Sequence, residues 1–477
     1  MNQKNLISAA LLACGLISHA NAANIIYITG STAFRGQAFN ALSSNLGPAA
    51  GGVFDAGTVD DVCTYGNSNA SKGTYMLIHG NIGATETYID CFWSGSEAGI
   101  AAVAGVDGSH LNDNAPLAGV PATFLIPDKT TNPNGNSSGL PDPSKLNGAP
   151  TQADLAFSDT SQAVSITKPV GSNKLTEYGI CGIIPFTWVK GTVNSADGAW
   201  SRLVNITHPQ AFELLSNPRT ADFFNSGVPG GSADFDHTVY LLGRNKGSGT
   251  RANYLLDSGY PIGNPIVQWQ VNSVVGVSAA GLFGLYFDGT ISGYNLAAIP
   301  SDGGNNNPNN GYESGGDVAK ALGGTGGVTA PTSGYTGPAG GKALTVGFLG
   351  IGDAGNLPIG NWLSLNGVPE SDGAIESGTY SAFGHEHIYG KNVPTNPAAT
   401  ALVPLMFKGI KFQLDNNDNT AHSGLNDKVD PTTLHSGGLY AFYMFADRSA
   451  QSDGPNYPVP TSASGGGAYT DYTHGTQ

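Results

Sequence analysis

The sequence predicts an α/β fold of two lobes with long loop insertions. The 477 residues are too many for one compact core, which favours two lobes or domains. Apolar runs of strand length repeatedly end in small polar turns, and helical periodicity follows them. Stretches rich in Gly, Asn and Pro separate these units, consistent with 69 glycines in the chain. The buried character of the strands further predicts sheets that are mostly parallel.

The first 22 residues have the pattern of a secretory signal. Lys4 gives a basic start, Leu6–Ile17 is apolar but too short to span a bilayer, and Ala20-Asn21-Ala22 fits a cleavage site. We therefore expect an exported protein, periplasmic or extracellular. Alternatively, Leu11-Leu12-Ala13-Cys14 resembles a lipobox, which would anchor the chain through a lipid on Cys14.

Three cysteines follow the signal, and an odd number in an oxidising compartment predicts one disulfide and one thiol. Cys63 and Cys91 flank one polar insertion and are the preferred pair. Cys181 lies in an apolar run and is expected to be a buried, inert thiol.

The net charge of −15, with only 20 Lys and Arg, argues against nucleic acid or an anionic membrane as a partner. It does not argue against a small anion, because a few local donors suffice to hold one inside an acidic protein.

The N-terminal half contains three units in which a strand ends in a small polar turn. Asn24–Thr29 precedes Gly30-Ser31-Thr32 and a helix over Ala33–Leu46, and the second unit occupies Cys91–Ile100. Ala153–Phe157 is a short strand that ends on Ser158-Asp159. Residues 48–90 and 106–150 are expected to be polar insertions.

The second half continues the same alternation. A strand over Val239–Gly243 leads into the turn Arg244–Thr250 and a helix over Arg251–Leu256. The other expected features are strands at Gly179–Val189 and Ala343–Leu349, helices at His208–Leu215 and Pro218–Asn225, a long loop over 300–341, apolar runs at Leu402–Phe412 and Gly438–Phe445, and a disordered stretch of about 25 residues at the end.

Four of the turns share one chemistry, since each places glycine or small hydroxyl residues after a strand. Ligands of open α/β sheets bind at the carboxyl ends of strands, where helix N-termini offer unpaired N–H groups. Glycine allows close backbone approach, hydroxyl groups donate, and Arg244 can present a bidentate fork to an oxyanion. These turns are Gly30-Ser31-Thr32, Gly95-Ser96, Ser158-Asp159 and Arg244–Thr250.

The order and content of these turns resemble the PstS-type phosphate-binding proteins, the solute receptors of phosphate ABC transporters. Arg-x-x-Gly-Ser-Gly-Thr at Arg244–Thr250 carries most of the resemblance, and weaker agreement extends over nearly the whole mature chain. The resemblance implies a type II periplasmic-binding-protein fold. Lobe 1 would combine residues 23–170 and 365–477, and lobe 2 would be residues 171–364.

The resemblance also implies roles for individual residues. The hydroxyl groups of Thr32 and Ser96, with neighbouring Ser31, would donate to the anion from lobe 1. Asp159 would accept a proton from bound phosphate and so reject sulfate, which carries no proton. The anion clamp of lobe 2 would consist of Arg244, Ser248, Gly249 and Thr250. The chain departs from the family at Ala33, Glu97-Ala98 and Lys246.

Three other motifs are assigned to structure rather than chemistry. Gly350–Gly355 is a formal G-x-G-x-x-G, but Pro358 interrupts the helix that a dinucleotide site needs. His385-Glu386-His387 lacks a third metal ligand, and Asp415–Asn419 lacks the glycine of a calcium loop. We therefore expect no cofactor and no metal.

The sequence thus predicts an exported protein that binds phosphate or a related oxyanion between its lobes and delivers it to an ABC permease. No serine lies in a nucleophile-elbow context, so we expect no enzymatic activity. One alternative is a structural or surface protein that self-associates and reuses the fold, since the insertions are long and the charge is low. A third possibility is a secreted enzyme that resembles a phosphatase.

Overall fold

A computed structural model describes residues 23–65, 70–73, 75–106, 120–121, 150–167, 169, 171–225, 234–262, 264, 266–272, 295–299, 311–312, 314–324, 341–371, 374–375 and 379–417. In the first half the elements are β1 (Asn24–Gly30), α2 (Arg35–Leu42), β2 (Asp61–Tyr65), β3 (Tyr75–Ile82), β4 (Thr85–Phe92), α3 (Ser96–Ala104), β5 (Val120–Pro121), β6 (Pro150–Thr151), β7 (Leu155–Ser158), β8 (Thr176–Lys190), α4 (Gly198–Arg202), β9 (Asn205–Ile206), α5 (His208–Ser216), β10 (Arg219–Thr220) and α6 (Ala221–Asn225). The second half contains β11 (His237–Leu241), α7 (Gly249–Asp257), β12 (Gln268–Asn272), β13 (Asn295–Ile299), α8 (Gly315–Ala321), β14 (Lys342–Gly350), α9 (Ile351–Ala354), β15 (Trp362–Leu365), β16 (Phe383–Gly390) and α11 (Pro397–Asn417).

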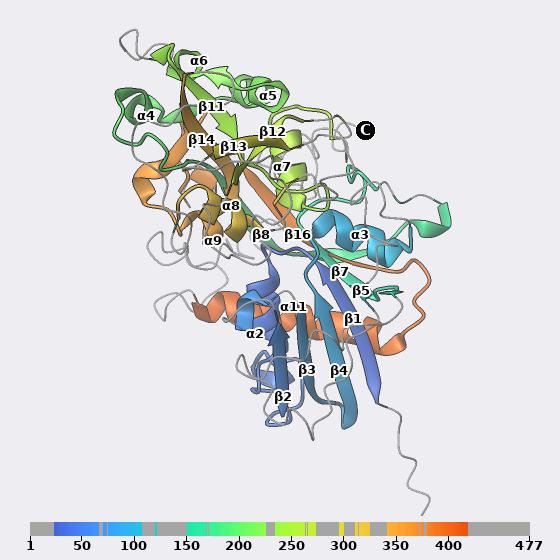
Figure 1. The fold of residues 1–477 in the computed structure, drawn as a ribbon. Helices are drawn as coiled ribbons and strands as arrows, with labels where there is room; N and C mark the ends of the chain where they lie inside the picture. The colour runs from blue at the N-terminus through green and yellow to red at the C-terminus, as the bar shows by residue number, and fades with distance from the viewer. Residues whose placement is uncertain are drawn as a thin grey trace, which may run out of the picture.

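The two lobes are built on strands that follow the order β10-β11-β14-β8-β16-β7-β1-β4-β3-β2. β8 belongs to both lobes, because its first part pairs with β16 and its last residues pair with β14. Figure 1 shows β1–β4, α2 and α11 in one lobe and β11, β14 and α4–α9 in the other. The chain passes between them along β8 and again just before β16, where Phe186 N donates to Ala382 O at 2.8 Å.

Helices cover both faces of each sheet, and the strand side chains alternate between the two faces. Ile26 and Ile28 of β1 pack in the cluster that includes residues of α2 and α11, whereas Tyr27 packs with the cluster around α3. In the other lobe Leu344 of β14 faces the side of α4–α7, and Ala343 faces α8 and α9. This arrangement confirms the predicted two-lobed α/β architecture. The exact lobe limits, after residues 170 and 364, stay a prediction.

Most of the strong sequence patterns correspond to the predicted elements. The predicted strands coincide with β1, β7, β8, β11 and β14, and the predicted helices with α2, α3, α5, α6 and α7. The run Leu402–Phe412 lies inside α11. The signal segment, Cys14, most of 106–150 and everything after residue 417 lie outside the described residues.

The prediction of mostly parallel sheets is wrong. β1 is parallel to β4 and β7, and β11 is parallel to β14, but β8 and β16 run antiparallel to each neighbour. β2, β3 and β4 also form an antiparallel meander inside the segment predicted to be a polar insertion. Parallel pairs need long crossovers, whereas this meander closes through a short turn.

The turn between β3 and β4 explains why the insertion folds as a hairpin. Gly83 and Ala84 have φ of 57° and 64°, the left-handed values that two-residue hairpin turns require. The carboxylate of Asp55 accepts from both of their N–H groups, at 3.2 Å and 2.9 Å. This support compensates an unfavourable conformation at Ala84, a residue that carries no sequence signal for such a turn.

The predicted Cys63–Cys91 disulfide is also wrong. Cys91 is a buried free thiol, and β3 lies between β2 and β4, with Leu77 beside Cys63 and Met76 beside Cys91. Two strand spacings put their Cα atoms roughly 10 Å apart, beyond the ~7 Å that a disulfide tolerates. Cys181 is a buried free thiol, as predicted.

The loop predicted over 300–341 is interrupted by α8. Ser314 caps this helix by accepting from Asp317 N at 3.2 Å, and Val318, Ala321 and Leu322 bury its apolar face. Among the described residues, no helix has the length and apolar character required to cross a bilayer.

Candidate oxyanion site between the lobes

The four small polar turns meet at one place between the lobes. β1, β4 and β7 are parallel neighbours, so the turns that follow them leave the same edge of the sheet. Gly95 N donates to Gly30 O at 2.8 Å, and Asp159 N lies 3.3 Å from Ser96 Oγ. Adjacent carboxyl ends therefore bring together three turns that are far apart in sequence.

Two glycines make this convergence sterically feasible. Gly30 has φ of 118°, and a Cβ there would lie 1.9 Å from Phe157 O. Gly95 has φ of 105°, and a Cβ there would lie 2.3 Å from Gly247 O in the other lobe. At both positions a side chain would be strained and would also push neighbouring backbone away.

The turn after β11 carries the residues of the predicted clamp. Ser248 is the N-cap of α7, and its Oγ accepts from Arg251 N at 3.3 Å. Gly249 and Thr250 begin the helix, and their N–H groups have no hydrogen-bond partner among the described residues. A helix start with unpaired N–H groups beside a buried arginine attracts an anion.

Arg244 reaches across to the first lobe. It is 1% exposed, its Nε donates to Tyr312 O at 3.2 Å, and its Nη2 lies 3.3 Å from Thr32 Oγ1. Thr32 belongs to the turn after β1, so this contact joins the two lobes. Ser31 lies deeper, with its N–H bonded to Phe157 O and its Oγ 3.3 Å from Phe34 N.

The lobes are in direct contact at the site. Gly247 O accepts from Glu97 N and Ala98 N, so two N–H groups of the α3 N-terminus are already paired. A Cβ on Gly249 would lie 1.5 Å from Asp159 Oδ1 and 2.5 Å from Ser96 Oγ. All eight predicted site residues thus gather in one small volume, and their role in binding stays a prediction.

The charges at the site are those of a buried cation among carboxylates. Burial raises the pKa of Asp159, while Ser96 and the charge of Arg244 oppose that rise. Burial likewise lowers the pKa of Arg244, and the charges of Asp353, Asp317 and Asp159 oppose it. Since a guanidinium stays protonated in proteins, Arg244 remains a cation.

Asp353 was not among the predicted site residues. Asp353 lies in the formal G-x-G-x-x-G segment, which forms the short helix α9 instead of a dinucleotide loop. Its charge acts on Arg244 and Arg35, which come from different lobes. Asp353 therefore balances positive charge at the interface between the lobes, and only the fold reveals this proximity.

Two buried glutamates also border the site. Glu97, which departs from the family pattern, accepts from Ile166 N at 3.0 Å and from Ser165 Oγ, and burial raises its pKa to about 7. Glu386 lies on β16 near Asp159, and its pKa is raised strongly by burial, with a further contribution from the charge of Asp159. Sequence reasoning passed over Glu386 because the flanking histidines suggested only a metal motif.

The histidines on either side of Glu386 do not form a metal site. His387 Nδ1 lies 2.7 Å from Glu177, and no cluster of His, Cys, Asp or Glu in the described residues is arranged to hold a metal ion.

A serine, a histidine and an aspartate meet elsewhere, but their geometry is not that of a catalytic triad. Ser381 Oγ and Asp257 Oδ2 lie 3.2 Å and 3.3 Å from the same atom, His208 Nε2. Ser381 also donates directly to Asp257. A triad needs the serine and the aspartate on opposite ring nitrogens, so this cluster does not support hydrolysis.

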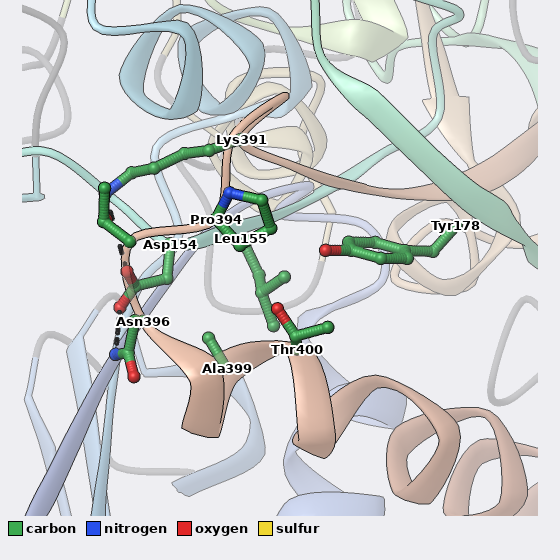
Figure 2. A pocket seen from close by; sticks show the side chains of 9 residues that line it. Asp154, Leu155, Tyr178, Lys391, Pro394, Asn396, Ala399 and Thr400 are labelled. Atoms are coloured by element: carbon green, nitrogen blue, oxygen red, sulfur yellow. Dashed lines mark hydrogen bonds and ion pairs between the residues drawn. The ribbon is translucent and has the colours of Figure 1, made fainter.

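A second polar cluster lies at the opposite, amino end of β7 (Figure 2). Asp154 accepts from Tyr27 N and from Asn396 Nδ2, each at 3.0 Å, and lies 3.5 Å from Lys391 Nζ. Its partners belong to β1 and to the segment between β16 and α11. The small pocket around it therefore joins structural elements and is separate from the interlobe site.

Neither protein-family models nor curated proteins gave a match to this chain. Among solved structures, it is similar to an ABC-type phosphate transport receptor from Vibrio cholerae, at 11% identity and a TM-score of 0.35, covering 82% of this chain and 97% of that one. It is similar to a putative phosphate ABC transporter substrate-binding protein with bound phosphate from Clostridium perfringens, at 9% identity, a TM-score of 0.36, and 82% and 94% coverage. A phosphate-binding protein from Stenotrophomonas maltophilia gives 11% identity, a TM-score of 0.38, and 93% and 98% coverage.

Proposed function

We propose that this chain is an exported solute-binding protein that holds phosphate, or a related tetrahedral oxyanion, between its lobes. The observation that carries the proposal is the meeting of Arg244, the unpaired N–H groups of α7 and the hydroxyl-bearing turns around one buried carboxylate. Donors from both lobes would surround the anion, so binding would favour the closed arrangement.

Asp159 supplies the basis for choosing among anions. It is 1% exposed, and it faces Ser96 and the start of α7. An ionised carboxylate here would accept a hydrogen bond from a protonated oxyanion but would repel sulfate. The proposed ligand is therefore an oxyanion that carries a proton at neutral pH.

The proposal assigns delivery of the anion to an ABC permease and no catalytic step to this chain. The N-terminal signal pattern supports export. A permease would contact the outer surface of the closed lobes, and self-association is a separate proposal that belongs to the structural alternative below.

Calorimetric titration of the mature chain, residues 23–477 stripped of bound anion, tests the proposal with phosphate and then sulfate. We expect binding of phosphate, no heat with sulfate, and a loss of about 10- to 100-fold in phosphate affinity for Arg244→Ala, since charge-assisted hydrogen bonds contribute about 1.5–3 kcal/mol.

The matched control is Arg219→Ala. Arg219 is partly exposed and pairs with Glu213 on α5, away from the site. The Arg219→Ala variant should bind phosphate with the same affinity as the unchanged chain. A folded protein that gives no heat with phosphate would overturn the proposal, as would equal losses in both arginine variants.

One observation favours a second candidate, a structural protein whose lobes stay locked together. Gly247 O occupies the two N–H groups at the start of α3, and Gly249 lies against Asp159. A locked interface of this kind would not need an anion. It predicts a folded protein with no phosphate affinity and with assembly that increases with concentration.

A further inference from the structure

Glu386 is placed where a bound oxyanion would meet it. It lies in β16 between β7 and β8, and its neighbour His387 is paired with Ser158, which directly precedes Asp159. Gly384, on the same face of the strand, lies against Asp159 O and the side chain of Asn253. The alternation of the strand turns Glu386 towards the site and the flanking histidines away from it.

The carboxyl group of Glu386 is buried without a hydrogen bond. The residue is 0% exposed, and neither Oε1 nor Oε2 has a hydrogen-bond partner among the described residues. The nearby hydroxyl of Ser31 opposes the rise in the pKa of this carboxyl, but burial outweighs it. A buried, unpaired carboxylate is costly, so the neutral acid is the stable form. Its O–H is then a donor that needs an acceptor.

The carboxyl oxygens of Glu386 make no hydrogen bond to the described groups around them, so an anion held in the site would supply that acceptor. Asp159 approaches from the end of β7, Ser31 from the turn after β1 and Cys181 from β8. Asp159 is the only other carboxyl among these, and its charge raises the pKa of Glu386 further. Nothing positive lies among them to hold Glu386 in the ionised form.

We propose that Glu386 is a specificity-determining residue of this site, which stays protonated and donates its O–H to an oxygen of the bound oxyanion. The inference rests on the proposed function. Asp159 takes a hydrogen bond from the ligand and Glu386 gives one, so the pair recognises an anion with both a protonated and an unprotonated oxygen. The proton of Glu386 stays on the residue, and no bond is broken.

This arrangement links binding to pH. When Glu386 ionises, the site loses a donor and gains a repelling charge. Phosphate affinity should therefore fall by about tenfold for each pH unit above the pKa of Glu386. Glu386→Gln keeps the size of the side chain and supplies an N–H donor at every pH. Its affinity should fall less steeply.

The experiment is phosphate titration of the mature chain and of Glu386→Gln from mildly acidic to alkaline pH. Phosphate titrates identically in both experiments, so the difference between the two profiles reports the residue. Glu177→Gln is the matched control, because Glu177 lies on the adjacent strand β8 and pairs with His387 instead of facing the site. The control should follow the unchanged chain.

The outcomes separate this inference from the proposed function. If neither protein binds phosphate, the proposed function fails. If both bind with the same pH profile, the proposed function stands and the role of Glu386 is overturned.

If the Glu386→Gln variant does not fold, a second measurement on the unchanged chain still tests the inference. The infrared difference spectrum of the unchanged chain, with and without phosphate, should show a carboxylic acid band that moves on binding and shifts when glutamate carries ¹³C. A band that moves only with ¹³C-labelled aspartate, or no band, would overturn the role of Glu386.

Discussion

Glu97 shows how one buried side chain can set the pH dependence of stability. It is 1% exposed, and burial raises its pKa from 4.5 to about 7. The folded state therefore binds a proton more tightly than the unfolded state does. This contribution to stability is fully present below about pH 4.5 and is lost as the pH rises through about 7.

We expect Glu97→Gln to remove that loss. Relative to the variant, the free energy of unfolding of the unchanged chain should fall by on the order of 3 kcal/mol between these limits. Denaturant unfolding of both proteins across this pH range measures the effect. Parallel curves for the two proteins would show that Glu97 ionises normally in the fold.

The residues of the site differ in how far the sequence could indicate them. Arg244 and Asp159 were predicted because each lies in a short motif that follows a strand. Glu386 and Asp353 lie in segments whose local patterns suggest other chemistry, a metal motif and a dinucleotide loop. Their position beside the site depends on pairing over more than 200 residues and on packing between lobes, which no local pattern encodes.

At the scale of elements, the start of α7 is the most sensitive part of the site. Glycine in a helix normally destabilises it, so Gly→Ala substitutions tend to add about 0.5–1 kcal/mol of stability. Gly249 should behave in the opposite way, because its Cβ would lie 1.5 Å from Asp159 Oδ1. We expect Gly249→Ala to reduce phosphate affinity by about tenfold to 100-fold, as overpacking costs about 1–3 kcal/mol.

Gly352→Ala is the control for this substitution. Gly352 also lies in the first turn of a helix, α9, but a Cβ at this position would meet no other atom within 4 Å. The variant should bind phosphate normally and unfold at a slightly higher temperature. Calorimetry measures the phosphate affinity of both variants, and thermal unfolding measures their stability. Equal phosphate affinities for Gly249→Ala and Gly352→Ala would show that the lobes do not close on Gly249.

Elements were predictable where one apolar run coincided with one element. β1, β7 and β14 are such runs, and each is buried along most of its length. The hairpin of β3 and β4 was missed because its turn depends on Asp55, which lies 28 residues before Gly83. α8 was missed because it is short and surrounded by glycine-rich sequence, although its Ser314 cap was visible.

At the scale of the molecule, the contacts across the lobes predict a change of shape. An opening motion would break two contacts between the lobes. One joins Arg244 to Thr32, and the other joins Gly247 to the start of α3. β8 and the segment before β16 would remain as connections, and these positions are suited to bending.

Small-angle X-ray scattering tests this motion. Phosphate should lower the radius of gyration of the mature chain and should leave that of Gly249→Ala nearly unchanged. An identical radius with and without phosphate, in a chain that binds phosphate, would instead indicate a site that fills without closure.

The position of β16 in the middle of the strand order constrains when the protein can fold. β16 separates β7 from β8, yet it is made more than 190 residues after β8 ends. A growing chain that has not reached Phe383 lacks the strand that joins its N-terminal sheet to the rest, and long-range pairing of this kind is slow. The polypeptide should therefore stay loosely structured until synthesis is almost complete, which would be compatible with the export that we propose.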